Sequence, residues 1–437
     1  MPSDLHYPLS TCTLDNGLRV VVNPDPSVPI VAVNLWYDVG SRDERPGETG
    51  WAHLFEHLMF QGSANVASGE HLHALQNVGG SVNATTFFDR TNYFETVPTG
   101  ALDLALWMEA DRLATLPDHL DQLKVDTQRE VVKEEKRQRY DNVPYGHAIR
   151  HLVELAFPVD HPYGHVTIGS MADLDAATPE AARTFFRRHY RPDNAVLTLV
   201  GDITAKDAFK RVDKAFGWIP SWNPRRRPAT PPLPPLAGRP RHEENADVPA
   251  DAVYLAWRLP ERDTAAYDAV EIALAVLGDG QTSRLYRQLV REKELAAAAS
   301  ASGLGLIGGT SLGFASARGL PNVPAEALDE ALLAEVARLA SDGPTPAEVE
   351  RAKAQFARLW LGELAQVDAR ADQFSAYATL HDDPAWVNRR LIEVEDVCVA
   401  DVAAAAAQLL DPSRAATLVY RKETPVPSTG SNERSAS

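Results

Sequence analysis

The chain of 437 residues contains only two cysteines, Cys12 and Cys398, near opposite ends of the sequence. Two thiols so far apart do not make a disulfide framework, and they favour a reducing compartment. No apolar run approaches the ~18–20 residues that a membrane-spanning helix needs, so no membrane association is expected. The N-terminus lacks a basic segment followed by an apolar one, which predicts a cytoplasmic protein. Removal of a signal peptide would instead place it in the periplasm or outside the cell.

Basic charge is scarce as well. The chain has 43 Lys and Arg against 60 Asp and Glu, a net charge of −17. Proteins that bind nucleic acids usually carry a basic surface, so we expect no nucleic-acid partner. Hydrophobic residues make up 44 % of the chain, enough for a sizeable core. The length predicts two to four domains.

The segment 222–248 is rich in proline and arginine, which predicts an extended linker rather than a packed element. It divides the chain into an N-terminal half, residues 1–221, and a C-terminal half, residues 249–425. The remaining residues, 426–437, are polar and are predicted to be a disordered tail. Strand and helix patterns are mixed in both halves, which predicts an α+β fold.

The two halves resemble each other at a fixed spacing of 220 positions. Val28 and Pro29 recur as Val248 and Pro249, and Pro192 recurs as Pro412, each time beside a short apolar strand pattern. Two matches at one spacing indicate a distant internal duplication. We therefore predict two related halves.

Residues 53–57 read His-Leu-Phe-Glu-His within an apolar, helical pattern. On a helix, His53 and His57 share one face, and Glu56 lies roughly 100° round from His57. Two imidazoles can grip a metal ion while the carboxylate reaches a water on it, as in the inverted metalloprotease motif. The alternative is an ordinary pair of surface or core histidines. At the 220-position spacing the second half reads Ala-Leu-Ala-Val-Leu, so only the first half carries this chemistry.

A catalytic zinc ion usually has three protein ligands, so a third must come from another element. The charged segment 121–140 contains no Pro or Gly and predicts a long helix that offers three glutamates, Glu130, Glu134 and Glu135. One stripe of this helix carries Gln128, Val132, Glu135 and Arg139. Periodicity makes Glu135 the leading candidate, but all three glutamates could be surface charges.

The motif at 53–57, followed by Gln-Arg-Glu-Val-Val-Lys-Glu-Glu at 128–135, resembles the insulinase/pitrilysin family of zinc peptidases. It is most similar to the small bacterial branch related to the mitochondrial processing peptidase. Further matching segments are Gly79 to Thr86, Trp107 to Arg112, His161 to Gly164, Ser283 to Leu285 and Arg291 to Lys293. The resemblance implies one Zn²⁺ per chain, held by His53, His57 and Glu135, with Glu56 as the general base.

The resemblance also implies the architecture and the substrate. Each half would be an α/β-sandwich with a mixed, mostly antiparallel sheet, and together they would form a bowl-like half of a substrate chamber. The strand containing Asn83, Ala84 and Thr85 would lie at an open sheet edge and bind an extended peptide as an added strand. For Asn83, a turn or a structural hydrogen bond is the alternative. The implied activity is a metalloendopeptidase acting on extended or unfolded peptides.

Two departures from the family bear on rate and partners. Gln128 stands where the family has a glutamate thought to assist catalysis, so its effect would be on rate or pH dependence. Arg291 matches a substrate-gripping arginine, but residues 295–299 lack the tyrosine that accompanies it. This predicts the zinc-bearing subunit of a homodimer or of a heterodimer with a paralogous chain. The alternatives are activity only within such a heterodimer, or a non-proteolytic structural role.

Overall fold

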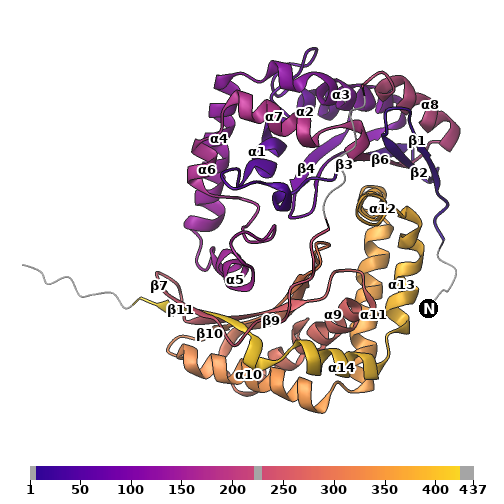
Figure 1. The fold of residues 1–437 in the computed structure, drawn as a ribbon. Coiled ribbons are helices and arrows are strands. Elements are labelled where there is room, and N and C mark those ends of the chain that lie inside the picture. The colour runs from indigo at the N-terminus through magenta and orange to yellow at the C-terminus, as the bar shows by residue number, and fades with distance from the viewer. Residues whose placement is uncertain (1–5, 221–228, 424–437) are drawn as a thin grey trace, which may run out of the picture.

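The computed structural model describes residues 6–220 and 229–423, which form two curved α/β halves that face each other (Figure 1). In the first half the strands are β1 (Ser10–Thr13), β2 (Arg19–Pro24), β3 (Ile30–Tyr37), β4 (Ser81–Thr86), β5 (Thr91–Pro98) and β6 (Ala195–Gly201). Its helices are α1 (Trp51–Leu58), α2 (Glu70–Asn77), α3 (Leu102–Thr115), α4 (Gln122–Lys136), α5 (Ala148–Ala156), α6 (Met171–Asp175), α7 (Pro179–His189) and α8 (Ala205–Phe216).

The second half repeats this mixture. Its strands are β7 (Arg241–Ala246), β8 (Ala252–Leu259), β9 (Ala296–Leu304), β10 (Ser311–Gly319) and β11 (Ala416–Lys422). Its helices are α9 (Ala265–Gly278), α10 (Ala325–Asp342), α11 (Pro346–Leu364), α12 (Val367–His381), α13 (Val387–Asp396) and α14 (Val399–Leu409). Two π-helical turns, η4 (Arg137–Asp141) and η6 (Tyr286–Glu292), follow α4 and α9 along the chain.

The two sheets share one topology. The first has the strand order β1-β2-β6-β3-β5-β4, and the second has β7-β11-β8-β10-β9. In the first sheet only β2 and β6 pair in parallel, and in the second only β7 and β11 do. Apart from β1, the strands therefore correspond one to one. This confirms the prediction of an α+β fold with two related halves and mixed, mostly antiparallel sheets.

Each sheet is covered on one face by helices of its own half. The core of the first half packs apolar residues of the strands, such as Leu35 and Leu197, against Phe55 of α1 and Phe186 of α7. The second half packs its strands against α9, α10 and α14 around Leu274. Burial of these side chains is the main favourable contribution to folding.

The other face of each sheet is covered by a helix from the opposite half. Phe374 and Tyr377 of α12 pack against Val196 and Val200 of β6 in the first sheet. Reciprocally, Leu152 of α5 packs with residues of β8 and β11 in the second sheet. α5 begins at residue 148 and α12 at residue 367, close to the spacing of the duplication. The halves are thus joined by two equivalent, exchanged helices, which Figure 1 shows between the halves, α5 on the left and α12 on the right.

The predicted linker at 222–248 differs from the structure in its last part. Residues 241–246 form β7, which pairs in parallel with β11 at the edge of the second sheet. The charged residues of β7 gave no apolar strand pattern in the sequence, because an edge strand needs few apolar side chains. Residues 222–228 and the predicted tail at 426–437 lie outside the described residues. None of the described helices is both long and apolar enough to cross a membrane.

Candidate metal centre

Helix α1 is held in place at its N-terminus. Its N-cap, Gly50, has φ +92°, a left-handed conformation that glycine adopts without steric cost. The buried carboxylate of Glu44 accepts hydrogen bonds from the backbone N–H groups of Gly50 (2.9 Å) and Ala52 (2.8 Å). His165 Nε2 lies 2.8 Å from the same carboxylate, so this histidine supports the start of the helix. The cap satisfies backbone donors that the helix leaves free.

The apolar face of α1 fixes the direction of its histidines. Trp51, Leu54, Phe55 and Leu58 are buried in the core of the first half. Three of the other positions face away from the core, with the two histidines toward α4 and Glu56 toward β4. His53, Glu56 and His57 are all partly exposed there.

Helix α4 supplies the third candidate ligand. Its N-cap is Asp121, whose side chain accepts a hydrogen bond from the Lys124 N–H at 2.8 Å. Val125 and Val132 bury one face of the helix, and Glu135 lies just beside that face with 18 % of its side chain exposed. Glu130 and Glu134 instead form ion pairs with Lys133 and Arg137 on the exposed side. The structure therefore separates Glu135 from the two surface glutamates.

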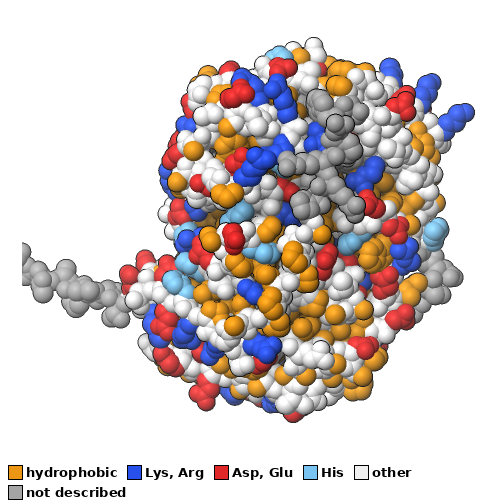
Figure 2. Space-filling model, viewed as in Figure 1, with side chains coloured by type: hydrophobic (Ala, Val, Ile, Leu, Met, Phe, Trp, Pro, Cys, Tyr) orange, Lys and Arg blue, Asp and Glu red, His pale blue; other side chains and the backbone are white. Residues whose placement is uncertain are grey.

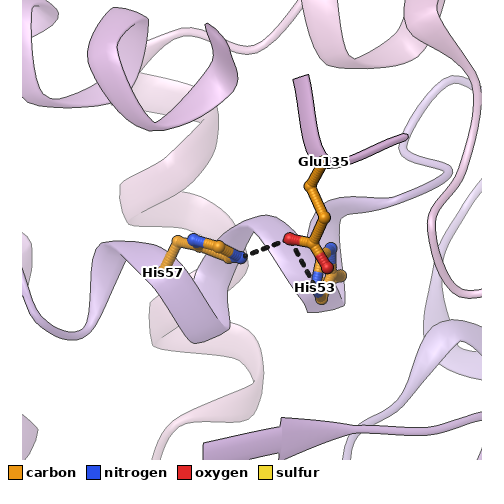
Figure 3. A group of neighbouring side chains, drawn as sticks. All are labelled: His53, His57 and Glu135. Atoms are coloured by element: carbon orange, nitrogen blue, oxygen red, sulfur yellow. Dashed lines mark ion pairs between the residues drawn. The ribbon is translucent and has the colours of Figure 1, made fainter. Parts of the chain in front are cut away.

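The three candidate ligands converge on one point (Figure 3). Glu135 Oε2 lies 3.3 Å from His57 Nε2 and 3.7 Å from His53 Nε2. The three donor atoms lie within 4.8 Å of one another. The second carboxylate oxygen of Glu135 pairs with Arg139 at 2.8 Å. Two histidine nitrogens and one carboxylate oxygen, with space for a water molecule, form the donor set of zinc in many peptidases.

Protonation in this group favours metal binding. Burial, reinforced by the charge of His57, lowers the pKa of His53 to about 4 from its ordinary 6.5. His53 is then neutral at neutral pH and has a lone pair to offer a cation. The hydrogen bond from His57 lowers the pKa of Glu135, so this carboxylate stays ionised. The charges and donor atoms of these residues fit a bound zinc ion.

Glu56 points to the neighbouring strand β4 rather than to the metal ligands. Thr86 Oγ1 donates a hydrogen bond to Glu56 Oε2 at 2.5 Å. Burial raises the pKa of Glu56 above its ordinary value, which makes this carboxylate a better proton acceptor than an exposed one. Thr86 thus holds the carboxylate between α1 and β4.

The metal ligands line a cavity of about 550 Å³. Glu56, Asn83, Ala84, Thr85 and Thr86 line it too, so the predicted substrate strand lies beside the predicted base. β4 is the last strand of its sheet, which leaves one side of it open. Asn83 Oδ1 also accepts a hydrogen bond from the Ala84 N–H at 2.9 Å. The structural hydrogen bond that was the alternative for Asn83 is therefore present, at the wall of the cavity.

Two predicted site residues lie away from this cavity. Gln128 is buried on α4, two helical turns before Glu135 and ~10 Å from it along the axis. Arg291 is exposed on the π-helical turn η6 of the second half, with its guanidinium 5.5 Å from the ring centre of Tyr286. The structure does not bring either residue to the cavity wall.

Other residues around the cavity were not predicted from the sequence. Arg139 and Thr86 contact the ligand and the base directly. Asp372 of α12 accepts hydrogen bonds at Oδ1 from Trp36 Nε1 and Asn92 Nδ2, both at 2.8 Å. Asn92 Oδ1 in turn accepts a hydrogen bond from Thr85 Oγ1 at 2.6 Å. The second half is therefore connected to the substrate strand by two successive hydrogen bonds, one between Asp372 and Asn92 and one between Asn92 and Thr85. No local sequence pattern indicates a contact between such distant segments.

The fold and this site define the class of two-half metallopeptidases with an inverted zinc motif. Residues 19–166 match the family model described as "Insulinase (Peptidase family M16)", and residues 176–356 match "Peptidase M16 inactive domain". The chain is 32 % identical to the zinc protease PqqE of Helicobacter pylori over 85 % of its own length and 83 % of that protein. The chain belongs to the insulinase family, peptidase family M16.

Further relatives agree in sequence and in structure. An uncharacterized zinc protease of Mycobacterium leprae is 29 % identical over 91 % of this chain and 88 % of its own length. The crystal structure of a protease from Helicobacter pylori matches with a TM-score of 0.89 and 28 % identity, covering 95 % of this chain and 99 % of that one. The periplasmic protease PqqL of Escherichia coli shares the fold, with a TM-score of 0.73, but this chain covers only 48 % of it.

Proposed function

We propose that this protein is a zinc metalloendopeptidase that hydrolyses extended or unfolded peptides. The observation that carries the proposal is the arrangement in one cavity of three groups: the convergent ligands His53, His57 and Glu135, the base Glu56, and the open edge of β4. The curated relatives named above, which are called zinc proteases, support the same class of activity.

Zinc bound by these ligands would polarise the scissile carbonyl and lower the pKa of a bound water. Glu56 then acts as the general base that accepts the proton of the attacking water. It passes this proton to the amine that leaves when the peptide bond breaks. Thr86 keeps Glu56 aimed into the cavity through its hydrogen bond. The proposed zinc content of this centre is one ion per chain.

The substrate is proposed to bind as an additional strand along β4, with its backbone next to Asn83, Ala84 and Thr85. Main-chain pairing of this kind accepts many sequences but demands an extended conformation. Folded proteins do not offer a free strand, so unfolded segments are preferred. Figure 2 shows hydrophobic side chains gathered on the second half, in the lower part of the view, and these would contact apolar side chains of a bound peptide.

A partner subunit is proposed to complete the site. Every residue that the described structure places on the cavity wall lies between 53 and 168, in the first half. Arg291 of the second half lies elsewhere, and no tyrosine occurs at 295–299. The length of PqqL, about twice that of this chain, is compatible with two such units working together. A homodimer or a heterodimer with a paralogous chain would provide the second unit.

Substitution of the base tests this proposal most simply. Glu56→Gln should reduce the cleavage of an unstructured peptide by roughly 10²–10⁴-fold while zinc content stays at the wild-type level. The matched control is Glu134→Gln, which changes an exposed glutamate on α4 next to the ligand and should leave both properties unchanged. Normal cleavage by Glu56→Gln would show that the proposed mechanism is wrong. The assay is run with and without a paralogous chain, and full activity of the isolated monomer would reject the need for a partner.

A further inference from the structure

A second group of metal-ligating side chains lies where the exchanged helix α5 meets the edge strand β7. His151 comes from α5, and His242 and Glu244 come from β7. His242 and Glu244 are two positions apart on a strand, so both side chains point to the same face. That face is the one α5 covers, and Figure 2 shows histidine and acidic side chains together at the surface in this region.

The distances within this group are those of a ligand cluster. His151 Nε2 lies 2.8 Å from Glu244 Oε2, and the rings of His151 and His242 are stacked with 4.5 Å between their centres. One donor atom from each of the three residues lies within 4.8 Å of the others. This cluster and the group of His53, His57 and Glu135 are the two potential metal-binding groups among the described residues.

The polar atoms of the cluster are incompletely satisfied by protein groups. Glu244 Oε2 is buried and, among the described residues, accepts no hydrogen bond of good geometry, although His151 Nε2 is close to it. A buried carboxylate oxygen that faces two imidazole rings and accepts no hydrogen bond of good geometry is stabilised by a cation.

We propose that His151, His242 and Glu244 form a second binding site for a divalent transition-metal ion of the zinc class. Imidazole nitrogens and a carboxylate oxygen suit zinc and its neighbours better than calcium or magnesium, which prefer oxygen ligands throughout. A small rotation of the stacked His242 ring would direct its nitrogen to the shared point. The partly exposed position leaves room for water as a further ligand.

This site would join the two halves of the chain. His151 belongs to the first half, whereas β7 belongs to the second sheet, so an ion bound by both fastens α5 to that sheet. The preceding turn of α5 carries Ile149 and Arg150, which line the cavity of the catalytic ligands. The ion would therefore hold one wall of the substrate cavity without touching the reacting groups. Its role is structural.

Zinc stoichiometry tests the site directly. Chelator-treated full-length protein is dialysed against micromolar Zn²⁺, and bound zinc per chain is measured by mass spectrometry. Wild type should bind two equivalents, and His242→Ala and Glu244→Gln should bind one. His73→Ala, which removes an exposed histidine on α2, is the matched control and should still bind two. Glu244→Gln preserves the size of the side chain and guards against a folding defect in the alanine variant.

Removal of the catalytic ligand separates the two sites. His57→Ala should bind one zinc ion, and the double variant His57→Ala/His242→Ala should bind none. Zinc should raise the unfolding temperature of the single variant by a few degrees and leave that of the double variant unchanged. If wild type binds one equivalent at saturation, or if His242→Ala binds as much zinc as wild type, the second site does not exist. Both readouts are independent of peptidase activity.

Discussion

Helix α1 and the last two turns of α9 occupy equivalent places in the duplicated fold, but their side chains have different environments. α1 presents His53, Glu56 and His57 to a cavity. The positions that correspond to the two histidines, Ala273 and Leu277, are completely buried in the core of the second half. The fold thus provides the same scaffold twice, and only the first copy presents candidate metal ligands to a cavity.

The comparison extends to the partner helices. Glu135 of α4 corresponds to Gln355 of α11 at the 220-position spacing. α11 and α14 both pack against α9. A smaller cavity of about 210 Å³ remains between α9, β9 and α11, and it contains none of the residues that correspond to the candidate ligands. The second half contributes helix α12, whose Asp372 supports the first half from behind its sheet.

The largest effects are expected at the equivalent positions His57 and Leu277, where substitution by alanine should change different properties. His57→Ala removes a ligand, so zinc and peptidase activity should both fall, the latter to less than about a hundredth of wild type. Leu277→Ala leaves a cavity in an apolar core and should lower the free energy of unfolding by about 2–5 kcal/mol. Zinc content and the activity of its folded fraction should not change. Denaturant titration and zinc analysis of both variants measure this difference, and retention of full zinc by His57→Ala would contradict it.

Removal of the contact that the second half makes with the substrate strand should have a smaller but measurable effect on activity. Asp372→Ala removes the acceptor for Asn92 and Trp36, so the hydrogen bond between Asn92 and Thr85 loses its anchor. We expect kcat/KM for an unstructured peptide to fall by roughly tenfold with zinc content unchanged. Asp372→Asn keeps one acceptor oxygen and should recover part of the activity. Asp368→Ala, an exposed position on the same helix, is the control, and equal kinetics of the two alanine variants would reject the link.

The stability of the protein should depend on pH through a buried carboxyl group of the second half. Glu271 lies in a cavity of about 210 Å³ with Arg262 and Tyr267, and burial raises its pKa to about 7. Between its ordinary pKa of 4.5 and about 7, the folded state holds a proton that the unfolded state has released. This stabilising contribution is therefore complete below pH 4.5 and is lost as pH rises to 7, by roughly 1 kcal/mol per pH unit. Urea titrations of metal-free protein should show a flatter profile for Glu271→Gln, and parallel profiles would contradict the assignment.

The smallest effect is expected at Gln128. Gln128→Glu restores the residue typical of the family, two helical turns from the ligand Glu135. Because the side chain is buried and does not line the cavity, zinc content should stay the same. Peptidase activity should rise by roughly two- to tenfold or shift in its pH profile. Unchanged kinetics across pH 6 to 9 would show that this position is silent here.

Local patterns predicted which side chains lie together in the first half, but they did not predict the long-range contacts. The spacing of His53, Glu56 and His57 defines one helix face, so these residues could be identified directly from the sequence. Glu135 needed the family resemblance, because periodicity made it only the leading candidate among three glutamates of α4, and packing against α1 is what separates them. Asp372 and the exchanged helices could not be predicted, because their partners are distant in the sequence, 280 positions from Asp372 to Asn92 and 102 from Ala156 of α5 to Arg258 of β8. The charged strand β7 was taken for part of a linker for lack of an apolar face.

Some predictions await experiment. The roles of Asn83 and Arg291 in substrate binding, the dimeric state and the cytoplasmic location all stay predictions. Arg291 is the one whose position agrees least with its predicted role, because it lies outside the cavity. A partner subunit could still bring its own arginine to the site.

The central claim is that zinc is held by α1 and α4 of the first half. Anomalous scattering at the zinc absorption edge from crystals of the zinc-loaded protein tests it most directly. The account predicts that the strongest peak lies at about 2.0–2.2 Å from His53 Nε2, His57 Nε2 and a carboxylate oxygen of Glu135. A strongest peak at any other place in the molecule, or no peak between these three residues, would contradict it.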